Sequence, residues 1–217
     1  EMCIRDRKGT NLHQDHAGVG TGIPDRLWEY RIKKMKTIGS NAIRTSHNPM
    51  SPVFLDLCDR LGMLVIEENR LMGINREHIG LLEHMIKRDR NHPCIILWSI
   101  GNEEWALEGN ERGLRITKSM TEYVHQLDST RLSTQGTAGG RVSLFGVDVK
   151  GYNYLRQNPI DEFHQKHPEW YSPVGSEETS GCGTRNVYYT DSLRGWMAPI
   201  NRTAQDDNHI INPMARG

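Results

Sequence analysis

Asn102, Glu103 and Glu104 stand at the end of an apolar run, in the stretch CIILWSIGNEE of residues 94–104. A run of this length that follows a proline and is rich in Ile is typical of a strand buried on both faces, as in a parallel sheet covered by helices. In a (β/α)8 barrel, the reactive groups lie where the strands end. The segment therefore predicts either a catalytic Asn-Glu pair or an ordinary acidic first turn of the next helix, without favouring one of them.

Polar residues also end the other segments that we predict to be strands. They are His13 and Asp15, Arg44 with Ser46 and His47, Glu67 and Glu68, Tyr152 to Tyr154, and Glu177. Each of these has an ordinary explanation on its own, such as pairing with a neighbouring acid, capping a helix or packing. Six or seven strands that all end in this way are better explained by a site at the mouth of a barrel.

Two carboxylates at such a mouth can cleave a glycosidic bond. One protonated acid assists the departing oxygen while the other attacks the anomeric carbon, and retaining enzymes hold the two carboxyl groups about 5–5.5 Å apart. The fourth and seventh strands lie on opposite sides of a small barrel. Glu103 and Glu177 can therefore face each other across that gap.

Strands and helices alternate along the chain. We predict strands at about residues 9–15, 41–47, 63–66, 94–102, 131–135, 147–153 and 173–177, and helices at about 24–39, 51–62, 76–90 and 116–127. This alternation predicts βα units and a parallel sheet, hence an α/β fold. Neither GxGxxG nor GxxxxGK[ST] occurs, which favours a (β/α)8 TIM barrel over an open doubly wound sheet.

Composition excludes several classes of function. The 217 residues carry 27 basic and 27 acidic side chains. There is no Lys/Arg-rich block or zinc-finger spacing, so we expect no nucleic-acid partner. No apolar run approaches the ~20 residues that span a bilayer, so we expect no membrane association. The four cysteines show no CxxC spacing, which fits a reducing compartment or simple buried thiols.

The ten histidines show no HExxH or similar set of metal ligands. His13, Asp15 and His16 form the one cluster that could bind a metal. Hydrogen bonding to a substrate or to one another is the more common role of such residues at strand ends. We therefore expect no metal and no cofactor.

Five segments closely resemble, in order, the catalytic domain of glycoside hydrolase family 2. They are GTNLHQDH at 9–16, NAIRTSHNP at 41–49, LCDRLGMLVI at 57–66, RDRNHP at 88–93 and WSIGNEE at 98–104. The family includes β-galactosidases, β-glucuronidases and β-mannosidases, and the resemblance extends over about residues 8–190. It implies a TIM-barrel glycosidase that retains the anomeric configuration and takes a carbohydrate as its partner.

The resemblance also implies roles for individual residues. Glu103 corresponds to the general acid/base, and Asn102 beside it to the residue that contacts the sugar 2-hydroxyl. Glu177, in the stretch PVGSEE, corresponds to the nucleophile. Its neighbour Glu178 is the alternative, and because side chains alternate along a strand only one of the two can point inward. Glu104 is then left as a helix-start or supporting acid.

Further substrate-binding residues follow from the same resemblance. Arg44 and Tyr154 correspond to groups that hydrogen-bond the nucleophile and keep it ionised. Tyr152 is an alternative to Tyr154. The expected sugar-binding residues are His13, Asp15 and His47.

Two absent motifs bear on the sugar. The Glu-x-His that contributes to a magnesium site in well-known galactosidases of the family is missing after the third strand. The Asn-x-Lys with which glucuronidases read the sugar carboxylate occurs nowhere in the chain. These observations favour a β-galactoside without a required metal. The alternatives are a β-glucuronidase or β-mannosidase, or a truncated barrel that binds sugar without catalysis.

The two ends of the chain depart from the family pattern. Residues 1–7, EMCIRDR, resemble translated adapter sequence and predict a non-native leader. Residues 8–190 would form the catalytic barrel and residues 191–217 an irregular tail. No apolar strand follows Tyr188. We therefore expect an incomplete barrel of about seven βα units without its closing strand.

Overall fold

The computed structural model describes residues 7–154, 161–169, 173–177, 191 and 193–194. The chain divides into two compact units, Glu1–Glu177 and Glu178–Gly217. The first unit contains all the helices and strands described below. In the second, the described residues form a turn in which the carboxylate of Asp191 accepts hydrogen bonds from the backbone N–H groups of Leu193 and Arg194.

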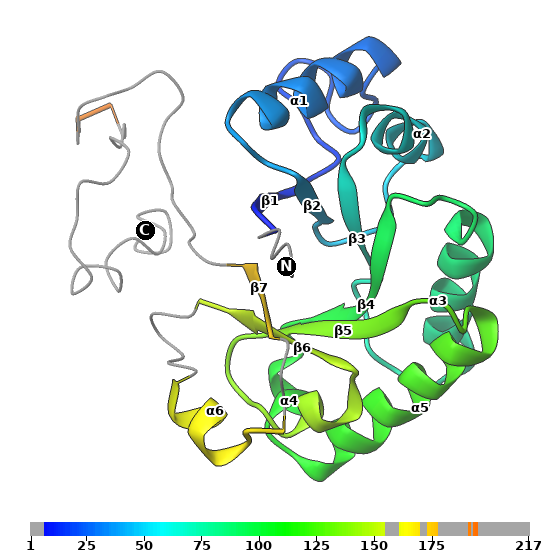
Figure 1. Ribbon diagram of the computed structural model, residues 1–217, viewed down its shortest axis with the longest axis vertical. Coiled ribbons are helices and arrows are strands. Elements are labelled where there is room, and N and C mark those ends of the chain that lie inside the picture. Colours follow the sequence, from blue (N-terminus) through cyan, green and yellow to red (C-terminus); the bar gives the residue numbers. More distant parts are fainter. Residues whose placement is uncertain (1–6, 155–160, 170–172, 178–190, 192, 195–217) are drawn as a thin grey trace, which may run out of the picture. The chain divides into compact units, whose positions relative to one another are not determined.

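Seven parallel strands form one sheet in the order β1-β2-β3-β4-β5-β6-β7 (Figure 1). The sheet curves into a nearly closed barrel, and the one unsealed seam lies between β1 and β7. This is the expected α/β barrel of seven units. Apart from 191 and 193–194, residues 178–217 lie outside the described part of the chain. The strands are β1 (Gly9–Leu12), β2 (Ala42–Thr45), β3 (Leu64–Glu68), β4 (Ile95–Asn102), β5 (Leu132–Thr137), β6 (Val149–Asn153) and β7 (Val174–Glu177).

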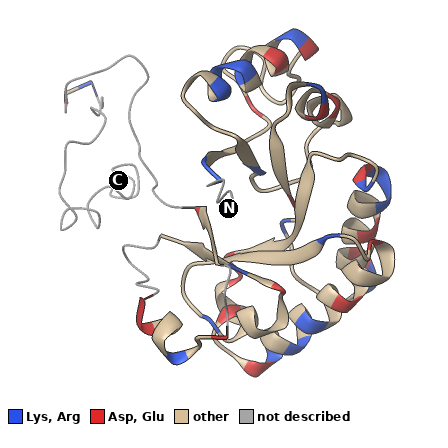
Figure 2. Cartoon of the chain, in the orientation of Figure 1, with Lys and Arg blue, Asp and Glu red and all other residues tan. Residues whose placement is uncertain are grey.

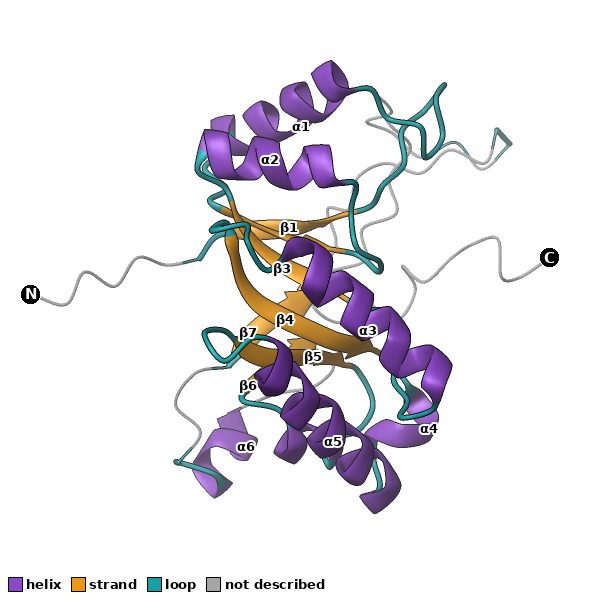
Figure 3. Cartoon of the chain, turned by 90° about the vertical axis from the view of Figure 1, so that its right-hand side faces the viewer, coloured by secondary structure: helices purple, strands orange, loops and turns teal. Residues whose placement is uncertain are grey.

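The long helices lie outside the strands (Figures 1 and 3). The four that the sequence predicts are present. The short elements near the fifth, sixth and seventh strands were not predicted, because four to six residues are too few to show a helical period. The helices are α1 (Asp25–Thr37), α2 (Pro52–Leu61), α3 (Arg76–Asp89), α4 (Trp105–Glu108), α5 (Glu111–Leu127) and α6 (Asp161–Lys166), with a 3-10 turn η1 (Ser143–Gly146).

Local sequence signals explain where α2 begins and ends. Ser51 precedes the helix in an extended conformation, and Pro52 occupies the first turn, where its missing N–H costs no hydrogen bond. The helix stops at Gly62, which has φ of 67° and donates its N–H to the carbonyl of Cys58. A left-handed residue after the last turn is a common end for a helix, and glycine adopts it without strain.

The core lies between the barrel and its helices. Trp28 of α1 packs on Phe54 of α2 with ring centroids 5.0 Å apart. In β4 every residue except Ile96 is buried, so the prediction of a strand covered on both faces is confirmed. Cys58 and Cys94 are buried free thiols.

The surface carries charges of both signs, which alternate along the helices (Figure 2). Glu29 on α1, for example, pairs with Lys33 one turn later at 2.7 Å. Among the described residues, none of the helices has the length and apolar character needed to span a bilayer.

Candidate active site

The strands deliver polar side chains to one end of the barrel. Because all seven strands are parallel, their carboxyl ends share one face of the barrel. Four strands finish in a polar residue that belongs to a single hydrogen-bonded network, and a fifth contributes an arginine one residue before its end. These residues are Glu68, Asn102, Asn153, Glu177 and Arg44.

Arg44 lies at the centre of this network. Its Nε donates to Glu68 Oε2 at 2.7 Å, and its Nη2 donates to Asn102 Oδ1 at 2.6 Å. Its Nη1 lies 3.3 Å from Glu177 Oε2. The side chain is buried, and one guanidinium therefore links the ends of β2, β3, β4 and β7. A planar fork of five donors suits this role better than a lysine ammonium would.

Glu68 balances the buried arginine. Its Oε2 also accepts a hydrogen bond from Ser99 Oγ at 2.8 Å, and its Oε1 lies 2.8 Å from Nδ1 of His47. The carboxylate is fully buried, and both of its oxygens have polar partners. Removing either member of such a buried pair leaves the other charge uncompensated, which is strongly destabilising.

Glu177 is held by two donors. The hydroxyl of Tyr154 donates to Oε1 at 2.6 Å, and Arg44 approaches Oε2. His47 Nε2 lies 4.0 Å from the same Oε2. These contacts fix the orientation of the Glu177 carboxylate, and a carboxylate can act as a nucleophile.

Glu103 follows β4 in a strained conformation. Its φ is 50°, and Tyr154 has φ of 56°, in a region that residues with a side chain rarely adopt. The Glu103 N–H donates to the carbonyl of Gly136 at 3.0 Å, which fixes the backbone. Two residues of this network are thus held in conformations that the surrounding structure must impose.

Asn153 connects Glu103 to the rest of the network. Its Nδ2 donates to Glu103 Oε1 at 2.7 Å and lies 3.0 Å from Asn102 Oδ1. Its own Oδ1 accepts from Ser176 Oγ at 2.6 Å. The two candidate carboxylates are therefore joined through two amides and one guanidinium.

Gly136 of β5 leaves room for these groups. A Cβ at this position would lie 2.8 Å from Asn102 Oδ1, 3.0 Å from Arg44 Nη2 and 3.1 Å from Asn153 Oδ1. Any side chain here would displace the network. A glycine in a strand is explained by this close approach of polar groups.

The structure brings together most of the residues singled out from the sequence. Arg44, His47, Asn102, Glu103, Tyr154 and Glu177 all belong to the network or touch it. His13 adjoins this group, because its ring meets that of His47 edge-on at 5.5 Å.

Asp15 and Tyr152 lie elsewhere. Asp15 is exposed, and within the described part of the chain its carboxylate shares no hydrogen bond with the network; only its backbone carbonyl is bound, by Arg31 at 2.8 Å. Tyr152 is buried, and its ring packs 6.0 Å from that of Phe163 in α6. It faces the helical layer rather than the mouth. Glu178, the alternative nucleophile, lies outside the described residues.

Glu68 and Asn153 were not predicted as site residues. In the sequence, Glu68 is one of several acids at strand ends, and Asn153 lies between the two candidate tyrosines, Tyr152 and Tyr154. The useful signal is position, since each is the last residue of a strand in a parallel barrel. The neighbouring acid Glu104 occupies the N-cap position directly before α4 and lies 3.8 Å from Arg70.

No metal site emerges from residues 7–154 and the shorter described segments, in which no three His, Cys, Asp or Glu side chains are grouped to hold an ion. In the cluster considered from sequence, His16 Nδ1 contacts the carbonyl of Ala17 at 2.9 Å, and His13 lies against His47.

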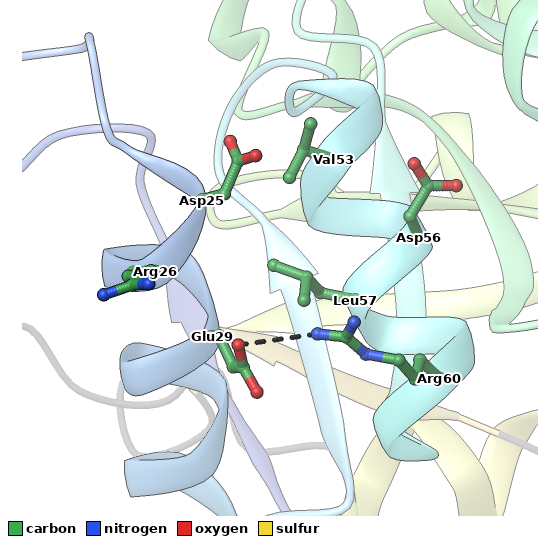
Figure 4. Close-up of a pocket in the computed structure, with 7 residues that line it drawn as sticks. All are labelled: Asp25, Arg26, Glu29, Val53, Asp56, Leu57 and Arg60. Atoms are coloured by element: carbon green, nitrogen blue, oxygen red, sulfur yellow. Dashed lines mark ion pairs between the residues drawn. The ribbon is translucent and has the colours of Figure 1, made fainter.

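A pocket of about 410 Å³ lies on the outside of the barrel, between α1 and α2 (Figure 4). Glu29 and Arg60 form an ion pair across it at 3.5 Å. None of its lining residues belongs to the network at the strand ends. The lining consists of Asp25, Arg26, Glu29, Val53, Asp56, Leu57 and Arg60. We interpret it as a groove between two packed helices.

A parallel barrel with two glutamates in one polar network at its strand ends has the features of a barrel glycosidase. Comparison with known proteins agrees with this class. The family model described as glycosyl hydrolases family 2, TIM barrel domain, matches residues 6–80 and 74–177. The chain belongs to this family.

Several relatives show how broad the family is. A β-galactosidase of Bacteroides ovatus is 32% identical over 88% of this chain and 28% of its own length. A putative β-glucuronidase of Formosa agariphila is 32% identical over 90% of this chain and 27% of its own length. Among solved structures, a family 2 member from Bacteroides cellulosilyticus superposes with a TM-score of 0.72 and 38% identity, covering 80% of this chain and 24% of that one. The chain thus spans about a quarter of the length of these relatives.

Proposed function

We propose that this barrel belongs to a retaining β-glycosidase that hydrolyses terminal β-galactosides by double displacement. Glu103 would act as general acid/base and Glu177 as nucleophile. The observation that carries the proposal is the unequal surroundings of these two glutamates. Among the described residues, Glu177 accepts hydrogen bonds from a tyrosine hydroxyl and a guanidinium, whereas Glu103 accepts one from a neutral amide.

This difference suits a division of labour between an acid and a base. The tyrosine hydroxyl and the guanidinium hold the Glu177 carboxylate in one orientation, which suits a nucleophile. Glu103 receives its hydrogen bond from the side-chain amide of Asn153, and we assign it the proton-transfer role. Enzymes that hydrolyse glycosides need one group of each kind.

The reaction then proceeds in two steps. In the first, Glu177 attacks the anomeric carbon to form a glycosyl ester, and Glu103 gives its proton to the departing glycosidic oxygen. In the second, Glu103 takes a proton from water, whose oxygen attacks the same carbon and releases Glu177. The chain's own donors, Arg44 and Tyr154, would hold the nucleophile in place during both steps.

Galactose is the sugar that the available observations favour. Two relatives, from Bacteroides ovatus and Thermoanaerobacter pseudethanolicus, are β-galactosidases that are 32% and 38% identical to this chain. The resemblance to a putative β-glucuronidase keeps a β-glucuronide as the second candidate.

Product analysis tests the proposal directly. The purified protein is given p-nitrophenyl β-D-galactoside or the corresponding β-D-glucuronide, and the first sugar released is followed by proton NMR. We expect β-galactose to appear before mutarotation produces the α form. An α anomer as the first product would contradict retention, and cleavage of the glucuronide alone would replace the galactoside assignment.

A further inference from the structure

Trp105 presents an indole ring to solvent directly beyond the proposed acid/base. Its side chain is 72% exposed, and its backbone N–H donates to the carbonyl of Glu103 at 3.0 Å. Single exposed apolar residues are common, so exposure alone decides nothing. The position of Trp105 suggests a role in binding the leaving group, because the group that protonates a glycosidic oxygen must lie next to the leaving group.

The segment that carries Trp105 is fixed by a buried carboxylate. Glu108, at the other end of α4, accepts hydrogen bonds from the backbone N–H groups of Gly139 at 2.8 Å and Gly140 at 3.1 Å. These bonds hold the loop after β5 against α4. A Cβ on Gly139 would lie 3.4 Å from Cε3 of Trp105, so the loop approaches the edge of the indole.

A polar pair also adjoins the acid/base. Arg70, from the loop after β3, approaches Glu104 at 3.8 Å and also donates to the backbone carbonyl of Asn102. Both side chains of the pair are partly exposed, at 38% and 30%. They retain capacity to exchange hydrogen bonds with a ligand.

We propose that Trp105 and the Arg70–Glu104 pair form the binding site for the first ring on the leaving-group side, and that this ring is a second sugar. The inference rests on the proposed function, because it takes Glu103 as the acid/base. A pyranose has an apolar face that stacks on an indole and a rim of hydroxyl groups that charged side chains bind. An aromatic leaving group would stack on the indole but would form no hydrogen bonds with the ion pair.

Binding measurements test this site without depending on turnover. In a Glu103→Gln background, Kd is measured by calorimetry for methyl β-galactoside, lactose and phenyl β-galactoside. Each ligand is compared with and without Trp105→Ala, and Trp105→Phe tests whether a smaller ring restores binding. Tyr30→Ala is the matched control, since Tyr30 is also exposed, at 54%, but lies on α1.

We expect Trp105→Ala to weaken lactose binding about fivefold to tenfold and to change methyl β-galactoside less than twofold. Arg70→Ala should weaken lactose in the same selective way. Equal losses for lactose and methyl β-galactoside would overturn the proposal, as would no loss for lactose. A loss confined to phenyl β-galactoside would overturn the sugar assignment in favour of an aromatic group.

The same comparison separates this inference from the function on which it rests. If methyl β-glucuronide binds and methyl β-galactoside does not, the galactose assignment fails. The effect of Trp105 is then measured on glucuronides with and without a second ring, where the same selective loss supports the site and an equal loss overturns it. Binding of neither methyl glycoside would contradict both proposals.

Discussion

Asn153 is a single amide that contacts two of the proposed site residues. Its Nδ2 donates to Glu103 Oε1 and to Asn102 Oδ1, and its Oδ1 accepts a hydrogen bond from Ser176 Oγ. Asn153→Ala removes the donor that fixes the proposed acid/base. We expect kcat/KM to fall about tenfold to a hundredfold, because a catalytic group that loses its orientation loses much of its rate advantage.

An asparagine outside the network provides the control. Asn75 caps α3 by accepting a hydrogen bond from the His78 N–H at 2.9 Å. Asn75→Ala should lower the free energy of unfolding by about 1 kcal/mol and leave kcat/KM unchanged. If both variants lose activity in proportion to their stability, the role proposed for Asn153 is wrong.

Glu103→Gln separates proton donation from nucleophilic attack. We expect it to slow the first step strongly for alkyl galactosides, whose leaving oxygen needs a proton, and far less for activated aryl galactosides, which need little assistance. The release of both leaving groups is measured in one pre-steady-state series. The result is the ratio of the rate loss with the alkyl galactoside to the rate loss with the aryl galactoside. Equal losses with both would argue against Glu103 as the acid.

At the scale of residues, the sequence identifies the groups but not all their partners. Glu103, Glu177 and Arg44 occur in distinctive motifs, and they meet in one network. Asn153 and Glu68 gain their place from contacts between strands that are far apart in sequence. Contacts between distant strands cannot be inferred from local sequence patterns. Even Arg44 and Glu177, which meet in the network, are 133 positions apart.

Strand β5 contributes space rather than a reactive side chain. Gly136→Ala would bring a methyl group to within 2.8 Å of Asn102 Oδ1 and 3.0 Å of Arg44 Nη2. We expect a loss of about 1–3 kcal/mol in the free energy of unfolding, as for other overpacked interiors. Activity should fall further than stability explains, because the displaced groups are those that hold the carboxylates.

Gly80→Ala is the comparison for Gly136→Ala. Gly80 lies within α3, and a Cβ there would meet nothing within 4 Å. Alanine should raise the free energy of unfolding by roughly 0.5–1 kcal/mol through helix propensity. Chemical denaturation and activity of the two variants, measured side by side, check both expectations; a Gly136→Ala protein with unaltered activity would contradict the crowding argument.

Among elements, long periodic segments are predictable and short ones are not. The four long helices and seven strands follow from hydrophobic period, proline and glycine positions. The four-residue helix α4 escapes this reasoning, although it carries Trp105 and Glu108. Its place is set by Glu108 accepting backbone N–H groups from the loop after β5, a tertiary contact.

The stability of the whole barrel should depend on pH through Glu67. This side chain is fully buried between β3 and the helices, where Oε1 accepts the Met50 N–H at 3.1 Å. Burial, reinforced by the charge of Asp89, raises the pKa of Glu67 from 4.5 to about 8. The unfolded chain loses this proton at lower pH than the folded chain, so stability falls as pH rises from about 5 to about 8.

Glu67→Gln should abolish this part of the pH dependence while keeping an acceptor for Met50. The contribution removed is at most about 1.4 kcal/mol per pH unit. Glu83→Gln is the control, because the hydrogen bond from Lys87 lowers the pKa of Glu83 and its linkage lies at more acid pH. Urea melts at pH 5, 6.5 and 8 measure how the free energy of unfolding changes with pH. If it changes equally in Glu67→Gln and in the parent protein, Glu67 is not the source of this pH dependence.

The whole fold is the level at which sequence reasoning succeeds most fully. Alternating βα units and buried apolar strands predict a parallel barrel, and seven parallel strands form one. The hydrogen bonds of the site depend on the interior of the barrel mouth, where two amide side chains and an arginine pack closely against a glycine. Their mutual distances depend on the closure of the sheet and therefore on the whole chain segment from β2 to β7.

The central claim is that Glu177 attacks the sugar. The most direct measurement is intact-mass spectrometry after incubation with a 2-deoxy-2-fluoro-β-galactoside that has a good leaving group, followed by peptide mapping. The fluorine slows both steps and the leaving group restores the first, so the glycosyl ester accumulates. We predict one added fluoroglycosyl group on Glu177; a group attached to another residue, or a folded and active protein that acquires none, would contradict the mechanism.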